Sequence, residues 1–270
     1  MWTQADRETH RETRKRYPSD LTDGEWALTV PFFATYRPLS TTIRAIVEAC
    51  LYLVAEGCRW RALPKDFPPW QTVRWWWDRF RREGVRDRAT RAPTPAARTA
   101  AGRNAEPRTG PVDSQGVRRG PRKGERGWDG GKKISGRERH VLTCSAGFLL
   151  ATMVTAASVH DKHGPDPLLA RAPAAGWRLR RLTGDGSYAG EDVAGDAARH
   201  GAILTVAARP RERQGFVPIP LRWRVEQAFG ILTTRSRRLV RDWEQLPEVS
   251  ETMMLVANLR RLIRAVARAC

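Results

Sequence analysis

The stretch HVLTCSAGFLLATMVTAAS, residues 140–158, decides the fold. Apolar and polar residues alternate along much of it, and Ala146-Gly147 divides it into two halves. Alternation with a period of two is typical of half-buried strands, and two such runs joined by a glycine-containing turn predict a β-hairpin. We therefore expect two antiparallel strands near the middle of the chain.

Further strands and helices are expected on both sides of this hairpin. The expected strands lie in PVDSQGV, WRLRRLTGDGSY and GAILTVAAR, residues 111–117, 177–188 and 201–209. Residues 221 to about 240 are expected to be helical, as are residues 249–268, where Ser250 is a candidate cap. The order strand, hairpin, connection, strand, strand, helix predicts an α/β fold with a mixed sheet flanked by helices.

The first part of the chain is predicted to be helical. LTDGEWALTVPFF (21–33) matches a capping box with Thr22 and Glu25. STTIRAIVEACLYLVAEG (40–57) has apolar residues at helical spacing, with Ser40 as the expected N-cap and Gly57 as the expected stop. WQTVRWWWDRFRREG (70–84) predicts a third helix that Gly84 should end, with an apolar face and arginines largely elsewhere.

Composition points to a polyanionic partner. The 270 residues hold 48 Lys+Arg against 29 Asp+Glu, a net charge of +19, and such an excess favours nucleic acid. No apolar run of about 18 residues is present, and MWTQADRETHRETRKRY at the start is polar. We therefore expect no membrane span and a cytoplasmic protein. The four scattered cysteines imply neither a zinc site nor disulfides, and Cys50 is expected in the core.

The chain is expected to divide into a disordered start (1–16), a helical DNA-binding domain (17–90), a linker (91–110) and a second domain (111–270). The two helices at 40–57 and 70–84 loosely fit a helix-turn-helix, in which Arg74 and Arg79 would contact DNA. A tryptophan-rich bundle with a solvated basic face is the alternative. The glycine-rich basic run 117–139 is expected to be a mobile loop.

Three acids occupy informative places in the second domain. Asp113 follows a short apolar entry, Asp185 ends an expected strand, and Glu226 lies in LRWRVEQAFG (221–230). On a helical wheel, Glu226 falls about 100° from Val225 on the rim of an apolar stripe, one turn after Arg222. Taken singly, each aspartate is best read as a turn residue or cap, and Glu226 as a surface ion pair with Arg222.

Together the segments resemble the DDE transposases of bacterial insertion sequences, in particular the IS5 group of the IS4-like families. The resemblance covers residues 17–265 and rests on YPSDLTDGEWAL, AEGCRWRALPKDFPPWQTV, WWWDRFRREG, VDSQGV, GWDGGKKISGRERHVL, AASVHD, GDGSYAG, FVPIPLRWRVEQAFG and RRLVRDWEQLPE. It implies an RNase H-like catalytic domain at 111–270. In it Asp113, Asp185 and Glu226 would be the catalytic triad.

One signature of that family is matched only in part. Arg222 and Glu226 fit the arginine and glutamate of the Y-x2-R-x3-E-x6-K pattern. Ile219 stands in place of the tyrosine and Thr233 in place of the lysine, for which Arg235 or Arg237 would substitute. Arg222 and Arg235 are therefore expected DNA contacts.

The chemistry of such a site explains why carboxylates are required. Two metal ions can stabilise the attacking and leaving oxygens of a phosphodiester displacement, and Mg²⁺ prefers oxygen ligands. The resemblance implies two Mg²⁺ or Mn²⁺ ions held by Asp113, Asp185 and Glu226. Asp129 and Asp161 are alternative acids, and His160, Asp161 and His163 form either a metal site or a polar loop.

The implied partner is double-stranded DNA, both the terminal inverted repeats and the target, bound by a homodimer or larger assembly at the bacterial nucleoid. Within the basic run, Lys132, Lys133, Arg137 and Arg139 are the expected contacts to the phosphate backbone. Two alternatives remain open: a catalytically inactive or domesticated DNA-binding protein derived from a transposase, and a nuclease that serves repair.

Overall fold

The computed structural model describes residues 3, 16–38, 40–121, 123–174, 176–207 and 220–269. The segment expected to be disordered, 1–16, lies almost wholly outside these residues, and so does Ile219. Of Arg222 only the helical backbone is described.

One mixed sheet organises the second half of the chain. Its strands are β1 (Thr109–Arg118), β2 (Gly127–Asp129), β3 (Ile134–Thr143), β4 (Leu149–Ala156), β5 (Arg181–Gly184) and β6 (Ile203–Val206). β3 pairs antiparallel with β1 on one edge and with β4 and β2 on the other. β5 and β6 add in parallel beside β1. The predicted mixed sheet and the hairpin that turns before Gly147 are confirmed.

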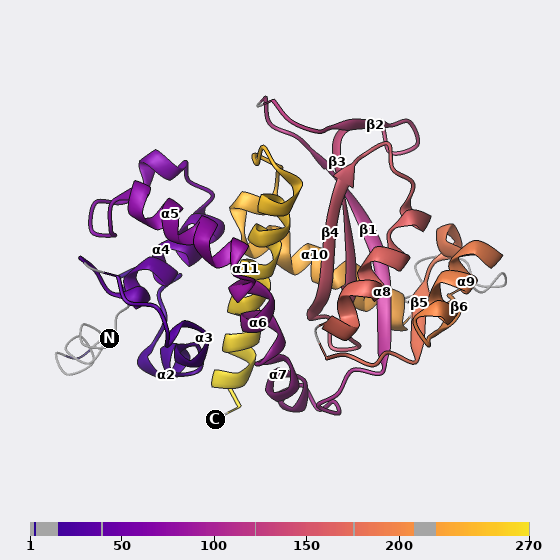
Figure 1. Ribbon diagram of the computed structural model, residues 1–270, viewed down its shortest axis with the longest axis horizontal. Coiled ribbons are helices and arrows are strands. Elements are labelled where there is room, and N and C mark those ends of the chain that lie inside the picture. The colour runs from indigo at the N-terminus through magenta and orange to yellow at the C-terminus, as the bar shows by residue number, and fades with distance from the viewer. Residues whose placement is uncertain are drawn as a thin grey trace.

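Helices cover both faces of this sheet (Figure 1). α8 (Pro165–Ala174) and α9 (Glu191–Arg199) form the crossovers that keep β5 and β6 parallel to β1, with the short turns η2 (Asp161–His163) and η3 (Gly186–Tyr188) beside them. α10 (Pro220–Arg235), η4 (Arg237–Leu239) and α11 (Pro247–Ala267) cover the opposite face. Each face therefore has its own apolar cluster.

The N-terminal part is helical, as predicted. It comprises α2 (Asp23–Ala27), α3 (Val30–Phe33), α4 (Ile43–Glu56), η1 (Trp60–Ala62), α5 (Trp70–Arg82), α6 (Val85–Arg91) and α7 (Thr94–Ala100). The Thr22 and Glu25 capping box is confirmed, with reciprocal bonds of 3.1 and 2.8 Å. Gly57 ends α4 in the left-handed conformation, as expected.

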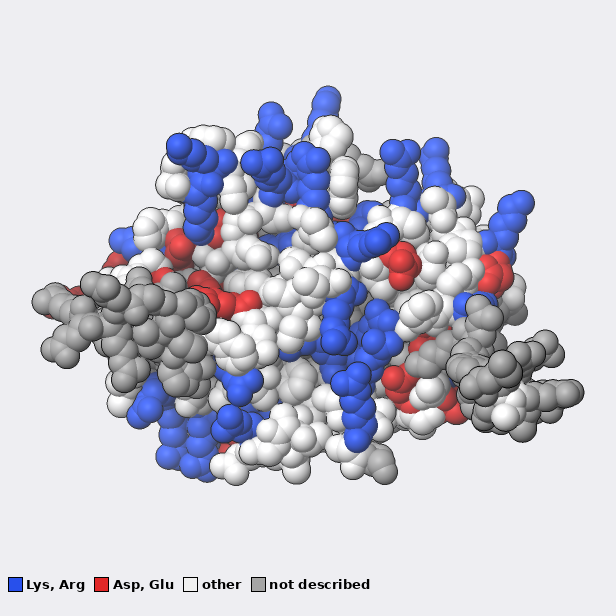
Figure 2. Space-filling model, turned by 180° about the vertical axis from the view of Figure 1, so that it is seen from behind, with Lys and Arg blue, Asp and Glu red and all other residues white. Residues whose placement is uncertain are grey.

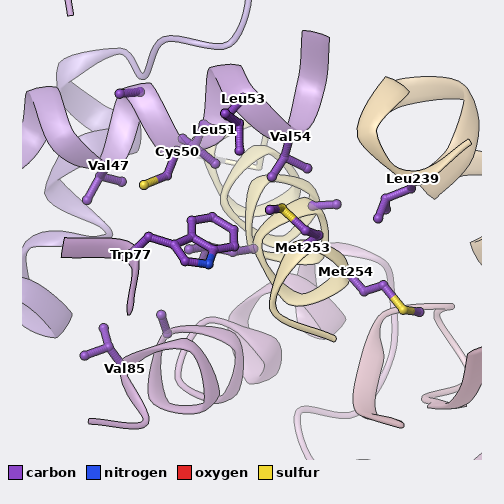
Figure 3. Packing of buried hydrophobic residues seen from close by; sticks show 14 of the residues in the cluster. Val47, Cys50, Leu51, Leu53, Val54, Trp77, Val85, Leu239, Met253 and Met254 are labelled. Atoms are coloured by element: carbon purple, nitrogen blue, oxygen red, sulfur yellow. The ribbon is translucent and has the colours of Figure 1, made fainter. Parts of the chain in front are cut away.

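These helices share one core with the C-terminal helices. In Figure 3, Trp77 of α5 and Cys50 and Leu51 of α4 lie against Met253 of α11. Burial raises the pKa of the Cys50 thiol to about 12, which fits its expected place in the core. Figure 1 shows α11 running between the N-terminal helices and the sheet. The two expected domains are therefore joined by a common apolar cluster rather than separated.

Four local expectations were wrong. The expected linker 91–110 contains α7, which packs on α11, and Ala97 is completely buried there. The basic run 117–139 contains β2 and the start of β3 instead of one mobile loop. Thr42, not Ser40, caps α4 by accepting the Ala45 N–H at 3.1 Å. Leu246 precedes α11 and Pro247 opens it, so Ser250 lies inside the helix and is buried.

Candidate active site

The register of the sheet brings Asp113 and Asp185 to matching positions. The last registered pair between β1 and β5 is Pro111 with Thr183, and each aspartate lies two residues further along the chain, Asp113 within β1 and Asp185 in extended backbone directly after β5. Because side chains alternate between faces, residues two apart point to the same side. Asp113 and Asp185 therefore belong to the same face, at the carboxyl end of the β1 and β5 ladder.

Helix α10 covers this face and carries Glu226. Val141 of β3 is the antiparallel partner of Asp113 and packs in the same apolar cluster as Val225 and Phe229 of α10. Val225 is 1% exposed, whereas Glu226 is an exposed residue. The apolar stripe thus holds α10 against β1 and leaves Glu226 on its rim, as the helical wheel predicted.

Both aspartates are held by backbone groups near their own position. Asp113 accepts the N–H of Ser114 at 2.8 Å. Asp185 accepts the N–H of Ser187 at 2.9 Å and the Ser187 hydroxyl at 2.5 Å. Such bonds limit the rotation of each carboxylate.

A buried tyrosine follows Asp185 in the chain. Burial is the largest cause that raises the pKa of the Tyr188 hydroxyl, and the charges of Asp113, Asp161 and Asp185 raise it further. Tyr188 is 1% exposed and is the last residue of η3, the short turn that follows β5.

The three acids are not drawn together into a finished metal centre. Within residues 3, 16–38, 40–121, 123–174, 176–207 and 220–269, no three His, Cys, Asp or Glu side chains are grouped so that they could hold a metal ion. The donor set itself suits Mg²⁺ or Mn²⁺, since all three candidates offer carboxylate oxygens. Converging carboxylates also repel one another until a cation lies between them.

Lys132 occupies a cluster of carboxylates on the other face of the sheet. Its ammonium lies 2.6 Å from Glu138 Oε1, 3.3 Å from Asp161 Oδ1 and 3.8 Å from Asp129 Oδ2. Asp129 also accepts the N–H groups of Gly131 and Lys132. Asp129 and Asp161, the alternative acids, therefore anchor the β2–β3 turn, and Lys132 is engaged within the protein.

The structure of the described residues does not support the alternative in which His160, Asp161 and His163 bind a metal ion. His160 caps η2 by accepting the N–H of Lys162 at 3.3 Å. With Asp161 held by Lys132, this segment fits the alternative reading of a polar loop.

Two expected DNA contacts were wrong. Arg137 is 0% and Arg139 2% exposed, because both point into the side of the sheet that η4 covers. Arg137 lies 3.2 Å from Asp242 Oδ2 and donates to three backbone carbonyls. Arg139 donates to the carbonyl of Leu239 at 2.6 Å, and burial lowers its pKa to about 10. Sequence alone gave no sign that these charges were buried.

The remaining basic candidates lie in two places. Arg74 and Arg79 of α5 are half-buried and pair with Asp78 and Glu83 at i, i+4 spacing, at 2.9 and 2.8 Å. They also lie over tryptophan or tyrosine rings, Arg74 over Trp60 at 5.0 Å. Their contact with DNA, and the helix-turn-helix that would position it, stay predictions.

Arg235 belongs to a groove that the sequence analysis missed. The basic members of its lining are Arg235, Arg260, Arg261, Arg264 and Arg268. Burial, together with neighbouring arginines, lowers the pKa of Arg260 and of Arg261 to about 10. The spacing of four between Arg260, Arg264 and Arg268 could have revealed one arginine face of α11. Figure 2 shows Lys and Arg side chains gathered down the middle of the back of the molecule.

Two family models match the chain. The model of the transposase DDE domain matches residues 104–260, which is more than half of the sequence and includes Asp113, Asp185 and Glu226. The chain belongs to the DDE transposase family. A second model, described as "Putative transposase of IS4/5 family", matches residues 21–90 of this transposase. A search of the curated proteins gave no match.

The two matches confirm the resemblance drawn from the sequence motifs. The DDE transposase domain is RNase H-like, and the mixed sheet with β3 and β5 on either side of β1 agrees with that fold. The helical match at 21–90 corresponds to α2 through most of α6. In the part of this transposase that the structure describes, no helix is both long and apolar enough to span a membrane.

Proposed function

We propose that this transposase binds the terminal inverted repeats of an insertion sequence and catalyses cleavage and strand transfer of DNA with Asp113, Asp185 and Glu226. The main support is the shared face: the β1–β5 register aligns the two aspartates, and α10 packs on the same side with Glu226 on its rim. DNA is an apt partner for a chain of net charge +19.

Each acid has a role set by its element. Asp113 lies on β1, Asp185 follows the adjacent β5, and both accept backbone N–H groups, so they would form the fixed half of a site for two divalent metal ions. Glu226 would complete the site from α10. When bound, the metal ions supply Lewis acidity at the scissile phosphate and at the attacking oxygen. Cleavage and joining at two element ends also require a homodimer or larger assembly in the DNA complex.

The decisive experiment compares three carboxylate variants with a matched control. Purified protein is incubated with Mg²⁺ and DNA that carries the inverted repeats from either side of its reading frame. We expect Asp113→Asn, Asp185→Asn and Glu226→Gln each to lower the cleavage rate by at least about a hundredfold. Loss of a residue that only supports a metal ligand already costs up to about a hundredfold, and these residues would bind the metal ions directly. Glu191→Gln, an exposed acid on α9, removes the same charge and should cleave normally.

Binding is measured separately in EDTA by gel shift, where all four variants should bind like the wild type. Cleavage by Glu226→Gln at the wild-type rate would refute the assignment of the triad. Binding without cleavage by the wild type, in Mn²⁺ as well as Mg²⁺, would instead identify a catalytically inactive DNA-binding descendant of a transposase.

A further inference from the structure

A second basic hollow lies at the far end of β1 and β3 from the hairpin turn. It is formed by residues of β1, the β2–β3 hairpin and the segment after η4, namely Arg118, Arg119, Arg126, Trp128, Lys133, Ser135 and Arg241. This lining contains five cationic side chains and no acid. Such a surface favours a ligand with negative charge.

The hollow opens on the same face of the sheet as the candidate triad. Trp128 pairs with Ser135 across β2 and β3. Ser135 and Val141 lie six residues apart on β3 without a register shift, so they point to one side. Val141 is the partner of Asp113. From Asp113 to Arg119, which also lines the hollow, is six residues, an even number, or about 20 Å at the rise of a strand.

Trp128 is displayed to solvent, unlike the core tryptophans. Its exposure is 59%, against 2% for Trp77. Gly130 and Gly131 follow it, and nothing except the indole itself lies within 4 Å of a Cβ built on Gly130. An exposed indole within a basic surface is costly in water and suited to stacking against a planar ligand.

The lysine beside Trp128 is held in a strained conformation. Lys133 has a φ of 53°, a left-handed value that non-glycine residues rarely adopt. Its neighbour Lys132 is turned to Glu138 on the opposite face. The turn therefore sends two adjacent lysines to different sides, and Lys133 is the one that lines the hollow.

We infer that this hollow binds an unpaired nucleotide in a single-stranded stretch of DNA, with the base stacked on Trp128 and the adjoining phosphates contacted by Arg126, Lys133 and Arg241. Guanidinium groups suit phosphate oxygens, and an indole accepts any base. Bases within a duplex are already stacked on their neighbours, so an exposed indole favours an unpaired strand. The identity of the ligand as DNA rests on the proposed function, because a strand cut at the triad would pass along β1 towards the hollow.

The test measures binding without any cleavage. The full-length Glu226→Gln protein is titrated in EDTA with a fluorescein-labelled 12-nucleotide oligothymidine and with a 12-base-pair duplex. Trp128→Ala should weaken binding of the single strand by about 5- to 150-fold, the range for loss of one stacked base. Trp128→Phe should keep most of the affinity, and binding of the duplex should change less than twofold.

Matched variants address specificity and charge. Trp75→Ala removes an indole of similar exposure, 52%, from α5 and should leave binding of the single strand unchanged. Replacing Arg126 and Lys133 together by glutamine should reduce the slope of log affinity against log salt by about 1.4 for the single strand. The fluorescence of a 2-aminopurine base in the oligonucleotide should be quenched when the Glu226→Gln protein binds. It should not be quenched by the double variant that also carries Trp128→Ala.

Several results would overturn the inference: equal losses for Trp128→Ala and Trp75→Ala, an unchanged affinity in Trp128→Ala, or a poly-glutamate peptide that competes as well as the oligonucleotide. The last would indicate an acidic protein partner. Because Trp128 is exposed, thermal unfolding should be the same in all tryptophan variants, which excludes misfolding. The binding measurement needs no metal and is therefore independent of cleavage. A wild-type protein that never cleaves DNA would refute the proposed function but would not contradict the binding of single-stranded DNA at Trp128.

Discussion

The burial of Arg137 leads to a quantitative prediction about stability. Its guanidinium lies 3.2 Å from Asp242 Oδ2 and donates to the carbonyls of Glu125, Glu244 and Gln245 at 2.7–3.1 Å, with both members of the ion pair fully buried. Arg137→Met keeps most of the aliphatic volume and leaves Asp242 as a buried charge without its cation.

The expected loss follows from what remains behind. Breaking a buried ion pair by removing one partner costs about 3–5 kcal/mol. The N–H of Glu244 still stabilises Asp242 at 2.9 Å, whereas three carbonyls lose a donor, so we expect about 4 kcal/mol. For a chain of this size, that corresponds to a fall in Tm of roughly 8–16 °C. Urea titration followed by circular dichroism gives the free energy of unfolding directly.

Controls separate this structural role from DNA binding. Arg126→Met removes an exposed arginine and should change the free energy of unfolding by less than about 0.5 kcal/mol. In a cycle with Asp242→Asn, the double variant should lose less than the sum of the two single ones. A loss below about 1 kcal/mol in Arg137→Met, together with a smaller salt slope for DNA binding, would refute the reasoning and restore Arg137 as a phosphate contact.

Two further predictions concern the sheet. His140 is 0% exposed, and burial lowers its pKa to about 4. Above pH 6.5 the imidazole is neutral in the folded and the unfolded state, whereas between pH 6.5 and 4 only the unfolded chain binds the proton. The free energy of unfolding therefore decreases as the pH is lowered from 6.5 to 4. His140→Gln should remove about 3 kcal/mol of that fall in urea titrations across this range, and an unchanged slope would contradict it. A Cβ on Gly136 would lie 2.0 Å from the Val117 carbonyl oxygen, so Gly136→Ala should cost about 1–3 kcal/mol or more in the same assay. Gly195→Ala meets nothing within 4 Å on helix α9 and should cost nothing; equal effects of the two changes would contradict the register of β1 and β3.

Local patterns carried the parts of the fold that depend on neighbours in sequence. The alternation in residues 140–158 predicted the β3–β4 hairpin, and Thr22 with Glu25 predicted a helix start, because both signals act over a few residues. The place of Glu226 on the rim of α10 also followed from helical periodicity. The alignment of Asp113 with Asp185 required the register of two strands far apart in sequence, which no local pattern contains.

The failures have one physical origin, which is that tertiary partners decide the burial of charges and of weak helices. Arg137 and Arg139 look like surface cations until Asp242 and the Leu239 carbonyl reach them from residues about 100 positions later. The alanine- and proline-rich residues 94–100 become a helix because α11 offers Ala97 a surface to pack on. Composition had suggested a linker, since it contains no information about α11.

The shared core around α11 constrains how the protein can fold as it is synthesised. Helices α4 to α6 leave the ribosome more than 150 residues before α11, yet they bury their apolar faces against it. Until α11 arrives, the part of this apolar surface that packs on α11 stays available to chaperones or to aggregation. A chain cut short before α11 would therefore expose this apolar surface, and we expect it to be degraded by proteases more readily than the full-length protein.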